Sequence, residues 1–357
     1  MSATRADRLE GLLADRGVDA LLVSDLVDVR WLTGFTGSSA LAVVGPSVRR
    51  FVTDFRYLAQ AGEQLDDSWQ REIAQDGLQR VAEGNAGQAA RLGFDDAVLS
   101  VKDHARLAEL VGGDVELVAA GGLVKELRQV KDAGELDAIR AAARLADAAL
   151  TEVLGRGLVG RTERDVALDL EMTQRRMGAE RVSFEPIVAS GPHGAHPHAV
   201  PRDVAIEAGT LVVIDWGAQL DGYASDCTRT FATGELSPQD RAIYDVVLAA
   251  QEAALAAVRP GPTGAEVDKV ARDVIDAAGF AEHFGHGLGH GVGLEVHEGP
   301  RLSRLGTTAL AAGQVVTVEP GVYVPGAVGV RIEDLVAVTE NGHEVLSSLS
   351  KALTVVV

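Results

Sequence analysis

Two pairs of strand-like stretches decide the fold of this chain: LVVIDWG (211–217) with VVTVEPG (315–321), and GYASD (222–226) with GVRIE (329–333). In the first pair, Asp215 and Glu319 occupy the same place and are 104 residues apart. In the second pair, Asp226 and Glu333 are 107 residues apart. Acids that recur at nearly the same offset at the end of or within apolar strands indicate an internal repeat.

Helical patterns precede each pair of strands in the same order. Apolar residues at helical spacing predict helices over 135–155 and 162–178 in the first half, and over 238–258 and 264–278 in the second. The second helix of each half begins with similar residues, although Thr263 and Glu266 have capping-box spacing, which explains that similarity without a function. Two such units related by a pseudo-two-fold axis would bring the four acids together.

Four carboxylates on apolar strands pose an electrostatic problem. Buried anions without partners cannot all stay ionised, because desolvating each charge is costly. Either most of them are protonated, or cations lie between them. Two divalent ions would bring a charge of +4 against the −4 of Asp215, Asp226, Glu319 and Glu333. The alternative, scattered surface acids, does not explain their repeat-equivalent positions, so the sequence favours a metal site.

Histidines concentrate in the same region, with seven of the nine between residues 193 and 297. Around His286 and His290 the sequence GHGLGHG (285–291) places glycines on both sides, which lets the backbone approach a ligand closely. One imidazole with four carboxylates forms a mostly hard oxygen site, which suits Mn²⁺ and is compatible with Co²⁺, Fe²⁺ or Zn²⁺. A structural or solvated role is expected for the remaining group: His193, His196, His283 and His343.

Composition excludes several classes of protein. The 357 residues carry 33 Lys+Arg and 52 Asp+Glu, a net charge of −19, which argues against nucleic acid or an anionic membrane as the main partner. The single cysteine, Cys227, excludes an intrachain disulfide framework. No stretch reads as a signal peptide, a membrane helix or a nucleotide-binding loop. A cytoplasmic protein is the default expectation.

The first third of the chain alternates short helical and strand patterns. This alternation predicts a small α/β domain over residues 1–128. A break at 128–131 leads into the repeated region, so the second domain is expected over 131–357. The small polar stretch TGFTGSSA (33–40) is interpreted as a turn between strands.

Five motifs together resemble the pita-bread metallopeptidases, the group of methionine aminopeptidase, aminopeptidase P, prolidase and creatinase. They occur in order and with the family's spacing: VVIDWG, GYASDCTRT, GHGLGHGVGLEVHEGP, VTVEPGVY and GVRIED. The resemblance covers about residues 131–350 and implies an α+β fold, with a pita-bread domain preceded by a smaller creatinase-like α/β domain. It also implies five ligands for two ions. Asp215 would hold one ion, His290 and Glu319 the other, and Asp226 and Glu333 would bridge both.

The resemblance assigns further roles around these ligands. A hydroxide activated by the two metals would attack the peptide bond, with Glu319 as general base or proton shuttle. His297 would stabilise the tetrahedral intermediate, and His198 matches a histidine that contacts the substrate. Three more residues match positions that line the proline pocket or surround the ligands: His286, Tyr323 and Arg331.

The resemblance favours hydrolysis of the peptide bond before a proline. TGFTGSSA and VTDFRYLAQA favour an Xaa-Pro aminopeptidase, which takes peptides with proline at the second position. A prolidase, which accepts only dipeptides, is the alternative. A metal-free creatinase-like amidinohydrolase and a non-catalytic binding protein are disfavoured, because all five ligand positions keep metal-binding side chains. A homodimer is also implied by resemblance.

Overall fold

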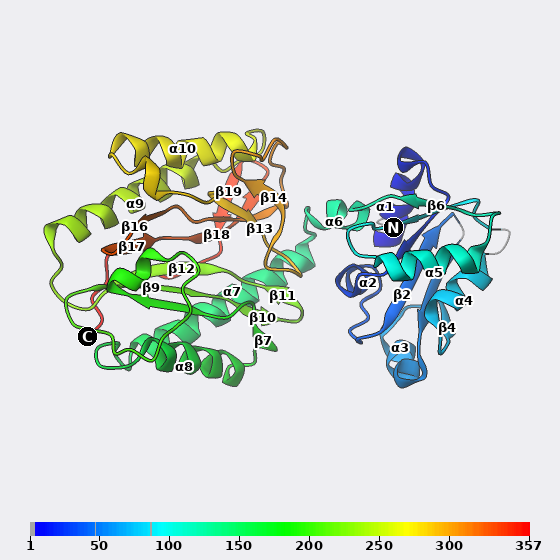
Figure 1. Ribbon diagram of the computed structural model, residues 1–357, viewed down its shortest axis with the longest axis horizontal. Helices are drawn as coiled ribbons and strands as arrows, with labels where there is room; N and C mark the ends of the chain where they lie inside the picture. Colours follow the sequence, from blue (N-terminus) through cyan, green and yellow to red (C-terminus); the bar gives the residue numbers. More distant parts are fainter. Residues whose placement is uncertain (1–3, 47, 86–87) are drawn as a thin grey trace. The chain divides into compact units, whose positions relative to one another are not determined.

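The computed structural model describes residues 4–46, 48–85 and 88–357. The chain divides into two units, Met1–Arg128 and Gln129–Val357, called here the N-terminal and C-terminal units. Figure 1 shows both, coloured along the sequence. None of the helices formed by the described residues is long and apolar enough to cross a membrane.

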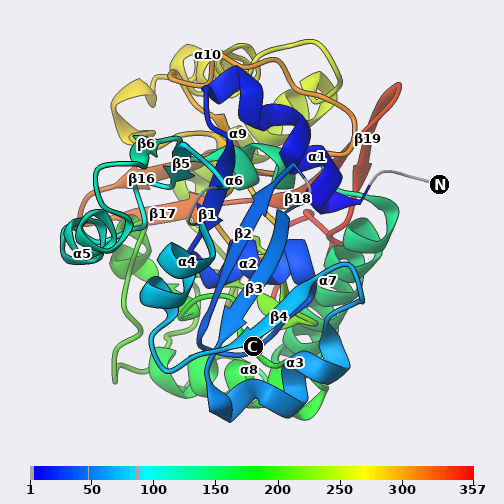
Figure 2. The same ribbon diagram turned by 90° about the vertical axis from the view of Figure 1, so that its right-hand side faces the viewer.

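The N-terminal unit is a six-stranded sheet with helices. Its elements are α1 (Arg5–Leu13), β1 (Ala20–Val23), α2 (Leu26–Thr33), β2 (Ala40–Gly45), β3 (Val48–Thr53), α3 (Leu58–Gln64), β4 (Gln70–Ile73), α4 (Gly77–Asn85), β5 (Arg91–Phe94), α5 (Val101–Val111), β6 (Glu116–Ala119) and α6 (Leu123–Arg128). The strand order is β4-β3-β2-β1-β5-β6, with β2 antiparallel to both of its neighbours and the other pairs parallel. In Figure 2, β1 to β4 lie side by side in blue. This arrangement agrees with the small α/β domain expected from the sequence.

Helix α2 was not expected from the sequence. Its first and last turns nevertheless carry clear signals, because the Asp25 side chain accepts from Val27 N and Gly34 ends the helix with a φ of 78°. The stretch TGFTGSSA therefore connects a helix to β2, where the sequence suggested a turn between two strands.

The C-terminal unit contains two helix pairs and short antiparallel sheets. The helices are α7 (Ala133–Leu154), α8 (Glu163–Arg176), α9 (Pro238–Ala257) and α10 (Gly264–Ala277). The strands are β7 (Arg181–Val182), β8 (Ile187–Ser190), β9 (Leu211–Trp216), β10 (Ala218–Leu220), β11 (Tyr223–Ala224), β12 (Cys227–Ala232), β13 (Gly289–Gly291), β14 (Glu298–Leu302), β15 (Val315–Val318), β16 (Gly321–Val324), β17 (Val328–Arg331), β18 (Asp334–Thr339) and β19 (Gly342–Val345). All four helices begin and end within a few residues of the ranges predicted from periodicity.

The repeat is visible in this unit. In Figure 1, α9 and α10 lie along one side of the strands, whereas α7 and α8 lie along the other. Strand β9 pairs with β12, and β15 pairs with β18 in the same antiparallel sense. Thr162 and Ala205 form an isolated bridge, and so do their counterparts Thr263 and Ala309. Each helix pair packs on its own apolar cluster, so both halves bury their strands in the same way.

The first turn of α8 holds a fully buried carboxylate. Glu163 follows the N-cap residue Thr162. Its oxygens accept hydrogen bonds from backbone and side-chain donors of Ser190 and Arg202 and lie 2.9 Å from Nδ1 of His193. Burial alone would raise the pKa of Glu163, but the hydrogen bonds, led by that of the Arg202 side chain, outweigh burial and lower the pKa to about 2.

We expect Glu163→Gln to lower the free energy of unfolding by about 3 kcal/mol at neutral pH, since one pKa unit corresponds to about 1.4 kcal/mol. A carboxyl whose pKa is lower in the folded state stabilises fully above its ordinary pKa of 4.5. That stabilisation is lost as the pH falls toward the folded-state value. Urea denaturation of the metal-stripped proteins should therefore show a difference between wild type and variant that narrows below pH 4.5. A difference that does not depend on pH would mean that Glu163 stabilises through shape alone.

Candidate metal centre and substrate cavity

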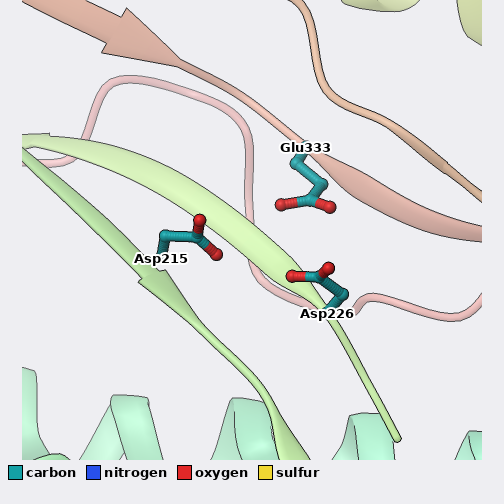
Figure 3. A group of neighbouring side chains, drawn as sticks. All are labelled: Asp215, Asp226 and Glu333. Carbon is teal, nitrogen blue, oxygen red and sulfur yellow. The ribbon is translucent and has the colours of Figure 1, made fainter. Parts of the chain in front are cut away.

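Three carboxylates converge in the C-terminal unit. Asp215 lies on β9, Asp226 directly precedes β12, and Glu333 follows β17. One oxygen of each lies within 4.8 Å of the others, and Figure 3 shows the three groups pointing toward one another. Asp226 and Glu333 are buried and Asp215 is half-buried. The repeat argument places acids from both halves of the domain together, and the structure does bring these three together.

His290 and Glu319 extend this group. His290 lies on β13, and Glu319 directly follows β15. The Nε2 atom of His290 is 3.5 Å from Oδ2 of Asp226 and 3.3 Å from Oε1 of Glu319. All five residues that the sequence assigned to metal binding therefore form one contiguous group, which we call the ligand cluster.

Burial and mutual repulsion disfavour the ionised carboxylates of the ligand cluster when no cation lies between them. Burial, followed by the charges of Glu333, Asp215 and Glu319, raises the pKa of Asp226 well above its ordinary value. Burial also raises the pKa values of Glu319 and Glu333, with the neighbouring acids adding to it. Asp226, Glu319 and Glu333 therefore resist ionisation while the neighbouring acids are charged.

Several lone pairs of the cluster lack a donor. Asp215 Oδ1 and Glu333 Oε1 are buried and have no hydrogen-bond partner among the described residues. Burial lowers the pKa of His290, and its Nδ1 lies 3.1 Å from the carbonyl oxygen of Gly291. The neutral ring thus carries its hydrogen on Nδ1 and turns the Nε2 lone pair toward two carboxylates. Carboxylate oxygens and an imidazole that all offer lone pairs to one space fit divalent cations.

Arg331 is the cation that the structure places beside the cluster. Its guanidinium donates to Asp215 Oδ2 at 2.6 Å, to the Tyr323 hydroxyl oxygen at 2.8 Å and to the Pro197 carbonyl at 3.1 Å. Burial would lower the pKa of Arg331, but the surrounding Tyr323, Asp215 and Glu319 raise it well above its ordinary value. Arg331 therefore stays charged and fixes the carboxylate of Asp215.

Tyr323 and His286 continue this chain of hydrogen bonds. Nδ1 of His286 lies 2.7 Å from the carbonyl oxygen of Gly287, and Nε2 lies 3.0 Å from the Tyr323 hydroxyl. Burial lowers the pKa of His286 to about 4, so the neutral ring donates from Nδ1 and accepts the Tyr323 hydrogen at Nε2. Both nitrogens are occupied, which leaves the ring face to contact a ligand.

Two threonines that sequence reasoning missed hold the carboxylates in place. The hydroxyl of Thr228 donates to Glu333 Oε2 at 2.7 Å and accepts from Arg331 Nε. The hydroxyl of Thr317 donates to Glu319 Oε1 at 3.0 Å. Thr228 lies two residues after Asp226 and Thr317 two before Glu319, and strand alternation at that spacing is the signal that could have found them.

A cavity of about 760 Å³ opens onto the cluster. All five cluster residues line it, and so do His198, His286, His297 and Arg331. His198, His286, His297 and Glu319 therefore face one common space. Among the residues singled out from the sequence, Tyr323 is not part of the cavity wall and lies behind Arg331 and His286.

Comparison with known proteins identifies the class of enzyme. The model of metallopeptidase family M24 matches residues 137–340, and the model of the creatinase/prolidase N-terminal domain matches residues 5–130. The chain therefore belongs to metallopeptidase family M24. It is a metal-dependent peptidase whose α+β pita-bread domain follows a creatinase-like domain, which confirms the family and fold expected from the motifs.

Similar proteins match nearly the whole chain. An Xaa-Pro dipeptidase of Pyrococcus horikoshii is 34% identical over 343 residues, 94% of each chain. A structure described as Xaa-Pro dipeptidase from Bacillus anthracis has a TM-score of 0.95 and 37% identity, covering 98% of this chain and 99% of that one. A structure of an X-Pro aminopeptidase from Thermotoga maritima has a TM-score of 0.91 and 35% identity, covering 99% and 100%. The similarity thus extends over both units.

Proposed function

We propose that this protein is an Xaa-Pro dipeptidase that uses two divalent ions, with Mn²⁺ as the preferred metal. The observation that carries the proposal is the complete ligand cluster, Asp215, Asp226, His290, Glu319 and Glu333, at the wall of one cavity. Among the similar proteins that carry a named activity, most are Xaa-Pro dipeptidases or prolidases, which supports prolidase activity better than the aminopeptidase activity favoured by two short motifs. The Thermotoga maritima relative keeps Xaa-Pro aminopeptidase as the second candidate.

The cavity has an apolar side that suits a proline ring. Phe184, Pro186, Ile187 and His286 all line it. Proline has no N–H, so a substrate with proline after the scissile bond needs no acceptor there. An apolar wall beside the cluster therefore supports selection of the imide bond.

Each remaining group has a proposed task in hydrolysis. Ions held by the cluster would polarise the scissile carbonyl and lower the pKa of water toward neutrality. Glu319 would take a proton from the attacking water and deliver it to the proline nitrogen, which must be protonated to leave. His297 would donate a hydrogen bond to the oxyanion, and His198 would orient the peptide. Arg331 keeps Asp215 in position, with Tyr323 and His286 behind it.

Peptides that differ in one feature test the proposal. Metal-stripped protein, with and without added Mn²⁺, is assayed on Arg-Pro, Arg-Pro-Pro and Arg-Ala. Hydrolysis of Arg-Pro alone, restored by the metal, is the expected result for a dipeptidase. Cleavage of Arg-Pro-Pro at a comparable rate would contradict the dipeptidase proposal and support an Xaa-Pro aminopeptidase instead. Equal cleavage of Arg-Ala would contradict proline selectivity, and inactivity toward every peptide in any metal would contradict the function itself.

A further inference from the structure

The carboxylate of Glu163 is fully buried and lies outside the cavity wall, yet its hydrogen-bond partners among the described residues belong to one segment that contributes residues to that wall. It accepts from Ser190 N and Oγ at one end of the segment and from Arg202 N, Nε and Nη2 at the other, at 2.9–3.1 Å. His193 Nδ1 is a further partner at 2.9 Å. One carboxylate thus ties together the two ends of residues 190–202, here called the arch.

The half of the arch that leads to Arg202 faces the cavity. Residues 197–201 all line the cavity, His198 among them. The carbonyl of Pro197 accepts from Arg331 Nη1 at 3.1 Å, which joins the arch to the residue that fixes Asp215. A change at the two ends of the arch would therefore act first on His198 and the Pro197 carbonyl, because Asp215 and Asp226 lie outside the arch.

Comparison of the two halves of the repeat shows that Glu163 is not needed to begin the helix. In the second half, Thr263 caps α10 and bridges Ala309, as Thr162 does with α8 and Ala205. The residue after Thr263 is Gly264 instead of a glutamate. The helix and the bridge thus form without a carboxylate at this position. In the first half, the glutamate at this position adds the hydrogen bonds to Ser190 and Arg202 that hold the arch.

We propose that Glu163 is a positioning residue, which holds the arch so that His198 and the Pro197 carbonyl keep their places in the substrate cavity. A glutamine at this position keeps the shape but offers one oxygen where the carboxylate offers two, so the six contacts cannot all be kept. The inference rests on the proposed function, because His198 matters only where a peptide is bound.

A double-mutant cycle tests whether Glu163 acts through His198. We expect Glu163→Gln to lower kcat/KM for Arg-Pro by about 10- to 100-fold, the loss typical of a misplaced binding group. In the His198→Ala background the same substitution should change kcat/KM by less than about threefold, because the group it positions is already gone. The rise in melting temperature on adding Mn²⁺ should stay close to that of wild type, because none of the five residues of the ligand cluster belongs to the arch.

The matched control is Glu266→Gln in the first turn of α10, where Thr263 is the only partner of the carboxylate among the described residues. It should leave kcat/KM unchanged. Arg202→Ala, which removes two of the six contacts at the surface end of the arch, should give a smaller loss with the same dependence on His198. This second variant decides the question even where Glu163→Gln folds poorly.

The outcomes separate the inference from the function on which it rests. Suppose that the wild type is active but Glu163→Gln lowers kcat/KM by the same factor in the wild-type and His198→Ala backgrounds: the positioning role alone would then be overturned. Unchanged kcat/KM in Glu163→Gln and Arg202→Ala would overturn it as well. A wild type that cleaves no Xaa-Pro peptide would overturn the proposed function and this inference with it.

Discussion

Replacing Glu333 by Gln should abolish metal-dependent hydrolysis without destabilising the metal-free protein. Glu333 is buried, and burial together with Glu319 and Asp215 raises its pKa well above the ordinary value. A neutral amide relieves this repulsion, so the melting temperature of the stripped protein should stay the same or rise. Losing a ligand removes several kcal/mol of transition-state stabilisation, and activity should fall by at least about 10³-fold. Asp226→Asn should behave in the same way.

The neighbouring acid provides the control. Asp334 is as buried as Glu333, but its oxygens accept from Arg229, Lys351 and Gln251 at 2.7–2.9 Å. Asp334→Asn breaks this paired network and should lower stability by about 3–5 kcal/mol. Differential scanning calorimetry with and without Mn²⁺ distinguishes the two variants. A Glu333→Gln protein that keeps normal activity or the normal rise in melting temperature with metal would defeat the two-metal assignment.

Replacing His297 by Ala should lower kcat by about 10²–10³-fold, the usual effect of removing one oxyanion donor. The ring of His297 lines the cavity next to His290, with a centroid distance of 4.2 Å. Neither of its nitrogens has a hydrogen-bond partner within the described part of the chain, so the ring is free to donate to a substrate. Burial lowers the pKa of His297, which favours a neutral ring that donates from one nitrogen.

Steady-state kinetics on Arg-Pro decide between two roles for His297. A lower kcat with little change in KM indicates stabilisation of the transition state. A rise in KM alone would mean that His297 only binds the substrate. His283→Ala is the control, because that ring packs near Phe280 and is absent from the cavity wall. It should leave both constants unchanged.

The helices and the acid positions of the catalytic domain could be predicted from the sequence because short, local residue patterns reveal its repeat. Apolar spacing located α7 to α10 within a few residues. The similar offsets of the acids, 104 and 107 residues, predicted that residues about a hundred positions apart would meet, and one oxygen each of Asp215, Asp226 and Glu333 does lie within 4.8 Å of the others. The position of these acids relative to the strand ends was predicted less well, because Asp226 and Glu333 lie just outside the strands.

Other features depended on tertiary contacts that no local pattern reports. In the N-terminal unit the sequence analysis missed four elements, all of nine residues or fewer: α2, β4, α4 and α6. The threonines that hold Glu333 and Glu319 are ordinary strand residues until the fold brings a carboxylate to them. Glu163 reads as an N-terminal helix acid, and its bonds to Ser190 and Arg202 join residues 27 and 39 positions away.

The ligand cluster is divided between the two halves of the domain, which affects the order of folding and ion binding. Asp215 and Asp226 belong to the first half, whereas His290, Glu319 and Glu333 belong to the second. Each half can close its own strand pair through nearby residues, but the full set exists only after the halves dock. Contacts of such long sequence separation form late and slowly. We therefore expect tight ion uptake to be a final step of folding, which would report that both halves have been completed and joined.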